Sequence, residues 1–221
     1  MAKVFISRAL SVESTFLARV GGAGHDVIGE SLLQIDPVPF ATVPETDWVF
    51  FYSKNAVIHY FAGVGEPPPS CKYGAYGTGT AAYLQREYGI QANFIGSAKP
   101  KATAEALATV AAGQRILFPR ARHSRHSLYK YLRYKTTVQE LIVYDNRVRE
   151  SFELPFCEVL VFTSPLNAQA YYGHYVSRSR QTIVSIGRTT AQELRRLGIR
   201  GVHIARQPAE AALAELVLSL L

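Results

Sequence analysis

Short runs of apolar residues alternate along this chain with longer segments in which apolar residues recur every three or four positions. Each run is followed by a turn that holds serine, threonine or glycine. Short continuous apolar runs are typical of strands buried on both faces, and their alternation with helical patterns predicts parallel sheets covered by helices. Within 190–197, Ala191, Leu194 and Leu197 are separated by polar residues, and Gly198 supplies a C-terminal stop. Similar patterns predict helices over 11–20, 54–62, 80–88, 102–111, 124–132, 166–176 and 209–220.

Three segments of the first half of the chain recur in the second half, in the same order. Residues 4–9 (VFISRA) match 116–121 (ILFPRA), 48–53 (WVFFYS) match 159–164 (VLVFTS), and 77–81 (GTGTA) match 187–191 (GRTTA). The starts of the three pairs are therefore 112, 111 and 110 residues apart. Such nearly constant spacing favours an internal duplication over a chance alignment of similar strand-to-helix turns.

Composition is that of a folded protein, with 48% hydrophobic and 19% charged residues among 221. This length allows one large domain or two small ones. The start lacks a secretory pattern and no apolar stretch is long enough to span a membrane, so we expect a soluble cytoplasmic protein without membrane contact. Cys71 and Cys157 lack metal-ligand spacing, and we expect two reduced thiols rather than a disulfide.

The chain carries a formal net charge of +7, from 24 basic and 17 acidic residues. This excess favours an anionic partner, which leaves open nucleic acid and a small ligand rich in carboxylates or phosphates. An RNA-binding role would use the only dense basic cluster, which spans 115–133. Its members are Arg115, Arg120, Arg122, His123, Arg125, His126, Lys130 and Arg133.

Residues that favour helix N-caps stand at the predicted junctions of strand and helix. They are Ser53, Thr80, Ser164, Thr189 and Thr190. Any one of them is explained as a cap, but together they place several helix N-termini at the carboxyl edge of each sheet. Ligands of parallel sheets bind at that edge, and helix N-termini suit carboxylate or phosphate groups.

Other catalytic and cofactor motifs are missing from the sequence. Gly74, Gly77 and Gly79 have neither the dinucleotide nor the P-loop spacing, which disfavours classical nucleotide binding. His123 and His126 fit a solvated basic face better than a metal site, so no metal cofactor is expected. Two extended segments, 34–40 with its prolines and 141–149, are interpreted as linkers. Tyr144 lies in the second, either as a packing group or facing a cleft.

A family resemblance rests on 161–165 (VFTSP), on 185–194 (SIGRTTAQEL) and on the later Gln207-Pro208. Together these segments resemble uroporphyrinogen-III synthase. The echoes in the first half and Val143-Tyr144 also fit, so that the resemblance covers essentially the whole chain. Its most specific mark is I-G-x-T-T-A-x-x-L-x-x-x-G, which ends at Gly198. The first serine turn departs from the family pattern, with Ser53-Lys54 where members often have Ser-Pro.

The resemblance implies a cofactor-free lyase of tetrapyrrole biosynthesis. Members convert the linear hydroxymethylbilane, which carries eight carboxylates, into uroporphyrinogen III by losing water and inverting the last pyrrole ring. The implied general acid is Tyr144. The turns around Ser53, Thr80, Ser164, Thr189 and Thr190 would bind carboxylates, with Arg8, Lys54, Arg120 and Arg188 as counter-charges. A monomer that receives its substrate from the preceding enzyme is expected, and a non-catalytic tetrapyrrole- or anion-sensing module of the same fold is the alternative.

The resemblance also implies two similar parallel-sheet α/β domains joined by a two-stranded linker, with the active site in the interdomain cleft. One domain would combine 1–33 with 150–221, and the other would span 38–142. The linkers would be 34–37 and 143–149. Each domain would then mix the first strand-helix unit of one repeat with the later units of the other, so that the halves of the sequence are not the domains.

Overall fold

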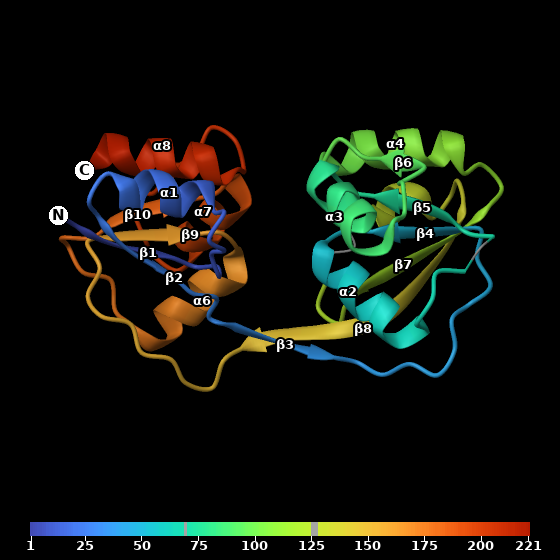
Figure 1. The fold of residues 1–221 in the computed structure, drawn as a ribbon, viewed down its shortest axis with the longest axis horizontal. Helices are drawn as coiled ribbons and strands as arrows, with labels where there is room; N and C mark the ends of the chain where they lie inside the picture. Colours follow the sequence, from blue (N-terminus) through green and yellow to red (C-terminus); the bar gives the residue numbers. More distant parts are fainter. Residues whose placement is uncertain (69, 125–127) are drawn as a thin grey trace. The chain divides into compact units, whose positions relative to one another are not determined.

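The computed structural model describes residues 1–68, 70–124 and 128–221, and in that part the strands form two sheets (Figure 1). The sheets and their helices make two compact units, one of Met1–Gln34 with Arg147–Leu221 and one of Ile35–Asn146. Helices cover the sheets of both units, and the predicted α/β class with two parallel sheets is confirmed. Among the described residues, no helix is long and apolar enough to cross a membrane.

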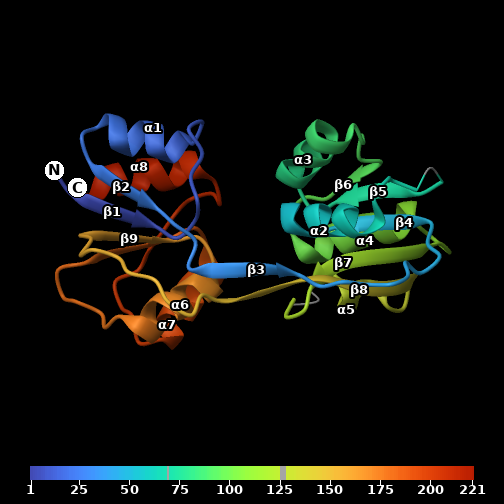
Figure 2. The same cartoon turned by 60° about the horizontal axis from the view of Figure 1, so that its bottom comes forward.

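The first unit has a sheet in the order β11-β10-β9-β1-β2. Its strands are β1 (Lys3–Ile6), β2 (Asp26–Gly29), β9 (Val159–Phe162), β10 (Thr182–Ser185) and β11 (His203–Ile204), and all pairings are parallel. Helices α1 (Thr15–Gly22) and α8 (Glu210–Leu220) cover one face, and α6 (Pro165–His174) and α7 (Arg188–Arg196) cover the other (Figure 2). Alternate residues of β1 and β9 therefore enter two separate cores.

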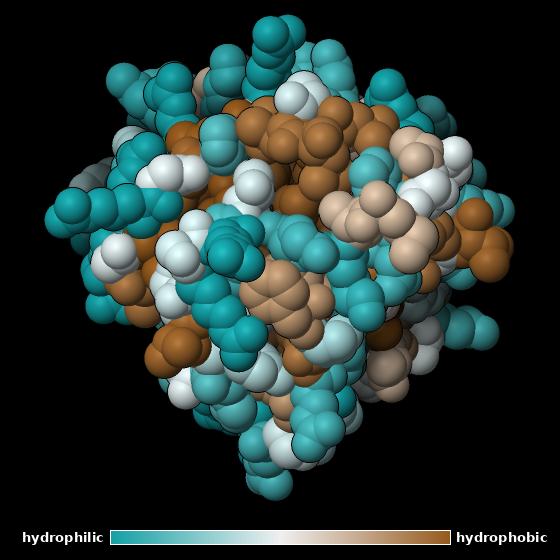
Figure 3. Space-filling model, turned by 90° about the vertical axis from the view of Figure 1, so that its left-hand side faces the viewer, coloured by the Kyte–Doolittle hydropathy of each residue, from teal (hydrophilic) through white to brown (hydrophobic). Residues whose placement is uncertain are grey.

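Helix α8 is apolar over most of its surface. Leu213, Ala214 and Val217 are fully buried against the sheet, and Leu216 and Leu220 are partly buried around them. Figure 3 shows the left-hand side of Figure 1, where hydrophobic residues gather in the upper part, at the level of α8.

The second unit has a sheet in the order β3-β8-β7-β4-β5-β6. Its strands are β3 (Leu33–Pro37), β4 (Trp48–Phe51), β5 (Lys72–Ala75), β6 (Phe94–Ile95), β7 (Arg115–Ala121) and β8 (Thr137–Val148). Helices α2 (Lys54–Val64) and α3 (Thr78–Tyr88) cover one face, and α4 (Pro100–Val110) and α5 (Tyr129–Leu132) cover the other. Strands β3 and β8 continue beyond this unit and carry the chain to and from the first one.

The two sheets have the same register at equivalent positions of the repeats. Val4 lies opposite Val159 in the first unit, and their counterparts Ile116 and Trp48 lie opposite each other in the second. The order β2-β1-β9-β10-β11 likewise corresponds to β8-β7-β4-β5-β6. Each sheet thus takes strands from both halves of the sequence. A chance alignment of similar turns does not explain this shared strand order and register.

An acidic side chain just before each central strand supports this pairing in the same way. Asp47 Oδ2 accepts the backbone N–H of Arg115 at 2.8 Å, and Glu158 Oε2 accepts that of Lys3 at 2.7 Å. These hydrogen bonds from backbone N–H groups are the main cause that lowers the pKa of Asp47 and of Glu158, and nearby cationic groups lower it further. The duplication therefore extends to a hydrogen bond between an acidic side chain and a backbone N–H, which the comparison of the two sequence halves did not reveal.

Several predicted element boundaries were wrong. The helix expected over 11–20 begins at Thr15 because the Ser14 side chain accepts the N–H of Leu17 and caps the helix there. The helix expected over 124–132 is the single turn α5, and Arg125 and His126 of the basic cluster lie outside the described residues. The segment predicted to be extended from 141 is part of the long strand β8, which begins earlier, at Thr137, and ends at Val148.

Candidate active site

Four helices begin directly after a strand of their own sheet, at its carboxyl edge. They are α2, α3, α6 and α7, which follow β4, β5, β9 and β10. None of the four has an acidic residue in its first turn, whereas α8 begins with Glu210. The positive end of each of these helix dipoles is therefore not offset by an acid of its own first turn, which favours binding of an external anion.

Ser53 and Ser164 occupy equivalent N-cap positions, as predicted for a cap. Both have extended backbones, and their hydroxyl oxygens accept the N–H of Ala56 and of Asn167, each at 3.2 Å. Each hydroxyl is thereby held at the open end of its helix.

Gly77 and Gly187 begin α3 and α7 without a side-chain cap. Apart from Gly187 and its chain neighbours, no heavy atom of the described residues lies within 4 Å of the position that a Cβ on Gly187 would take, so the space beside this helix start is open. The prediction of Thr80, Thr189 and Thr190 as N-caps was wrong, because the two glycines are the caps and the threonines lie in the first turns, where Thr80 and Thr190 are buried. The first-turn N–H groups next to these glycines have no side-chain acceptor at the cap and are suited to hold carboxylate oxygens.

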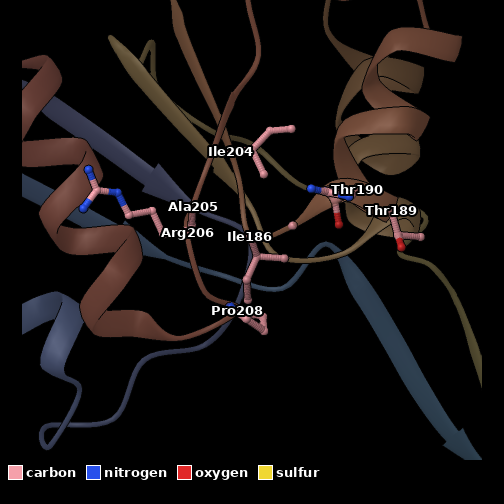
Figure 4. Close-up of a pocket in the computed structure, with 9 residues that line it drawn as sticks. Ile186, Thr189, Thr190, Ile204, Ala205, Arg206 and Pro208 are labelled. Atoms are coloured by element: carbon pink, nitrogen blue, oxygen red, sulfur yellow. The ribbon is translucent and has the colours of Figure 1, made fainter. Parts of the chain in front are cut away.

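A cavity of about 660 Å³ lies at the start of α7 in the first unit (Figure 4). Three of the predicted site residues line it, namely Arg188, Thr189 and Thr190. The other lining residues are Ile186, Gly187, Ile204, Ala205, Arg206 and Pro208. In Figure 4 the Arg206 side chain extends away from Thr189 and Thr190. The structure thus brings together one cluster that the sequence predicted.

The segment after β11 was not predicted as part of this site. Ala205, Arg206 and Pro208 line the cavity because β11 ends at Ile204, beside the carboxyl end of β10. The signal was present in the sequence, since the residues that follow any strand of a parallel sheet reach its carboxyl edge. The two-residue length of β11 concealed it.

In the second unit a cavity of about 610 Å³ extends along α3 and shares two equivalent positions with the first-unit cavity. Thr78 and Ile95 stand there where the first unit has Arg188 and Ile204. Its other lining residues are Ala81, Ala82, Gln85, Gln91 and Ala92, so that no charged side chain lines it. Of these two cavities, the one in the first unit is lined by arginine.

Tyr144 faces the start of α2 because strand β8 carries a bulge. Arg120 lies opposite Ile142 and Ala121 opposite Tyr144, so that Val143 is the extra residue. Val143 and Tyr144 consequently pack into the same core cluster, although neighbouring residues of a regular strand face opposite sides. The bulge thereby turns Tyr144 toward α2.

The Tyr144 hydroxyl lies 3.3 Å from Ser53 Oγ, and either oxygen is able to donate. The ring stacks on His59, with the ring centres 5.3 Å apart. Sequence reasoning missed His59, which comes from the same helix as the Ser53 cap.

The Tyr144 side chain is buried. Burial raises the pKa of the Tyr144 hydroxyl, and the hydrogen bond with Ser53 opposes this rise. The group is therefore a protonated hydrogen-bond donor at neutral pH. Burial also lowers the pKa of His59, which favours a neutral ring beside Tyr144.

Three of the predicted counter-charges already contact groups of the protein. Arg8 pairs with Glu210 at 3.2 Å and keeps 42% of its side chain exposed, whereas Arg120 pairs with Glu140 at 3.3 Å and keeps only 12%. Lys54 Nζ lies over the ring of Tyr83, 5.8 Å from its centre. Arg120 thus has less surface left for a ligand than Arg8.

A family model described as Uroporphyrinogen-III synthase HemD matches residues 14–215. The chain belongs to the uroporphyrinogen-III synthase family. The enzyme that gives this family its name is a lyase of tetrapyrrole biosynthesis, so the chain is a member of an enzyme family. A comparison with curated protein sequences finds no match.

Solved structures of this family share the fold. Uroporphyrinogen-III synthetase from Helicobacter pylori 26695 is 23% identical, with a TM-score of 0.78 and with 100% of each chain covered. A mutant uroporphyrinogen III synthase from the extremely thermophilic bacterium Thermus thermophilus is 15% identical, with a TM-score of 0.58, and the match covers 100% of this chain and 99% of that one. The fold thus agrees with the family assignment along the full chain.

Proposed function

We propose that this chain converts hydroxymethylbilane into uroporphyrinogen III, with loss of water and inversion of the last pyrrole ring. Membership of the synthase family supports the reaction. The observation that carries the proposal for this chain is the set of four helix N-termini without acids at the carboxyl edges of its sheets. A substrate with eight carboxylates needs several such anion-binding turns, and both units contain them.

We assign the carboxylate contacts to the turns at the starts of these four helices. In the second unit they are the turns around Ser53 and Thr80, with Lys54 as counter-charge. In the first unit they are the turns around Ser164, Thr189 and Thr190, with Arg188. Open space at Gly187 and the position of Arg188 at the cavity support the first-unit assignment most directly. Arg8 and Arg120 remain proposed counter-charges that would have to act beside Glu210 and Glu140.

Tyr144 is proposed as the general acid. The carbon–oxygen bond of the terminal hydroxymethyl group breaks, the electron pair leaves with the oxygen, and the adjoining pyrrole becomes an azafulvenium cation. A hydrogen bond from the Tyr144 hydroxyl would stabilise the departing hydroxide, and its raised pKa keeps the proton available. Ser53 Oγ is placed to hold that hydroxyl in position.

Ring closure needs control of conformation more than covalent help. The azafulvenium also closes spontaneously to the isomer without inversion, so the enzyme has to hold the chain in the geometry that directs attack to the substituted carbon of the last pyrrole. Because the pyrrole nitrogen itself drives hydroxide departure, the proposal requires no cofactor and no metal. We also propose that the chain acts as a cytoplasmic monomer, and the reactivity of the linear substrate supports direct hand-over from the preceding enzyme.

Isomer analysis with freshly generated hydroxymethylbilane tests the reaction. The purified chain, with and without a metal chelator, should give uroporphyrinogen III faster than spontaneous closure gives the uninverted isomer. Heat-treated protein is the control. A product mixture equal to that control would refute the synthase reaction, and activity lost only with the chelator would refute the metal-free mechanism.

A further inference from the structure

Asn167 lies in the first turn of α6 and is almost fully buried, with 4% of its surface exposed. Its Oδ1 accepts the backbone N–H of Leu32 at 2.9 Å, and its Nδ2 donates to Ser164 Oγ at 3.0 Å. Its own backbone N–H donates to the same Ser164 oxygen at 3.2 Å. One side chain thus joins the Ser164 turn to the segment that leads into β3.

The backbone partner fixes which way the Asn167 amide points. A backbone N–H only donates, so the atom that faces Leu32 has to be the amide oxygen and the atom that faces Ser164 the amide nitrogen. Ser164 Oγ therefore receives two donors. A hydroxyl oxygen has two lone pairs, and both are now used.

The Ser164 proton consequently points away from Asn167. Among the described residues, the structure gives this proton no acceptor. It lies at the start of a helix whose first turn holds no acid. A carboxylate oxygen at that helix start would complete the arrangement, since it accepts both the Ser164 hydroxyl proton and free N–H groups of the turn.

The second unit has no counterpart of this device among its described residues. The residue equivalent to Asn167 is Ala56, whose backbone N–H donates to Ser53 Oγ, with the Tyr144 hydroxyl as the other neighbour of that oxygen. Because either of these two hydroxyls is able to donate to the other, no second fixed donor sets the direction of the Ser53 proton as one does at Ser164. The two serine turns, alike in backbone, differ in the direction that their protons can take.

We propose that Asn167 is a positioning residue that orients the Ser164 hydroxyl as a fixed donor toward a substrate carboxylate. The inference rests on the proposed function, because it names the group that determines how one of the proposed turns binds. Asn167 acts through Ser164 and does not itself touch the substrate.

The same hydrogen bonds reach both connecting strands. The Leu32 carbonyl accepts the backbone N–H of Arg149 at 3.0 Å, and Arg149 in turn pairs with Glu30. Leu32 precedes β3 and Arg149 follows β8. A carboxylate bound at Ser164 is thereby linked, through Asn167, to the points where both strands enter the first unit.

Asn167→Asp is the sharpest test. The variant keeps an oxygen for the Leu32 N–H but places a second acceptor toward Ser164, so that the serine proton turns inward. We expect KM for hydroxymethylbilane to rise about 10- to 150-fold, the loss of one hydrogen bond to a charged group, with kcat within about twofold. Ser219→Asp, which adds the same charge at an exposed site near the end of α8, is the matched control and should change KM little.

Combination with Ser164→Ala separates positioning from simple repulsion by the new acid. If Asn167 acts through the Ser164 hydroxyl, Asn167→Asp has little further effect on KM in the Ser164→Ala background. An equal rise in both backgrounds would overturn the proposal, as would an unchanged KM in the single variant. A parent protein that forms no uroporphyrinogen III above the control would instead refute the proposed function itself.

Discussion

Tyr144→Phe isolates the proposed general acid with little change in packing. The ring stays in place against His59 and the core cluster, and only the hydroxyl and its hydrogen bond to Ser53 are removed. Ser53 still accepts the N–H of Ala56 and continues to cap α2. A neutral hydrogen bond of this kind contributes about 1 kcal/mol, which corresponds to a fall of about 2–4 °C in melting temperature for a chain of this size.

The expected loss of rate is larger than the loss of stability. In the transition state the departing oxygen becomes negatively charged, and a hydrogen bond to a charged group contributes about 1.5–3 kcal/mol. At about 1.4 kcal/mol per factor of ten, kcat should fall about 10- to 150-fold. Because the pKa of Tyr144 lies above its usual range, the parent enzyme should show no loss of activity from this group until the pH exceeds about 10.

Rate and product should be measured together. Stopped assays with separation of the isomers give kcat, and the enzyme-catalysed product should remain uroporphyrinogen III, because the variant alters hydroxide departure and not ring orientation. Tyr60→Phe is the matched control, since its buried hydroxyl belongs to the same cluster and has no hydrogen-bond partner among the described residues. An unchanged kcat in Tyr144→Phe would remove this residue from the mechanism. An equal fall in Tyr60→Phe would attribute the effect to packing.

The open space beside Gly187 predicts that Gly187→Leu fills the cavity and raises KM several-fold, while the melting temperature stays the same. Gly198→Ala should instead lower the free energy of unfolding by about 1 kcal/mol and leave KM unchanged, because Gly198 has a φ of 83°. Kinetics and thermal melts of the pair check both. Arg188→Gln should raise KM at low salt and less so at high salt, because an exposed charge is screened, and KM at two ionic strengths tests this. For His59 the folded pKa is lowered, so the unfolded chain binds the proton more readily. Stability should therefore fall as pH drops below about 6.5, and His59→Gln should remove that part of the slope in melting temperature against pH.

The fold was predictable because its signals are local and repeated. Each central strand is a continuous apolar run, and Trp48, Val49, Phe50 and Phe51 are all buried from alternating sides of one sheet. Helix ends that depend on side-chain caps were harder to predict from the sequence. The start of α1 is fixed by Ser14 together with Glu210, which accepts the Ser14 hydroxyl from almost two hundred residues away at 2.7 Å. No local pattern contains such a partner.

The candidate site was predictable where it is built from turns, and much less so where it depends on register. Ser53, Ser164 and Thr190 stand at strand ends that the apolar runs reveal. The bulge that turns Tyr144 toward Ser53 is a property of the pairing of β7 with β8. The sequence of one strand alone does not determine this pairing. Asn167 had a signal, since it stands three residues after a serine N-cap, where polar side chains return to the cap.

The duplication explains why the two serine turns differ. The backbone geometry of the turn was kept in both copies, as the extended Ser53 and Ser164 show, while the groups that hold each hydroxyl diverged. In one copy the oxygen faces a tyrosine hydroxyl whose proton is available for chemistry. In the other, the side-chain amide and the backbone N–H of Asn167 occupy both lone pairs of the serine oxygen and leave a donor of fixed direction. The proposed mechanism makes use of this division, because a serine hydroxyl that shares its proton with a general acid cannot also be a fixed donor to a carboxylate, whereas the N–H groups of its turn can still bind one. The prediction is therefore asymmetric: Ser53→Ala should lower kcat, and Ser164→Ala should raise KM, as steady-state kinetics of the two variants can decide.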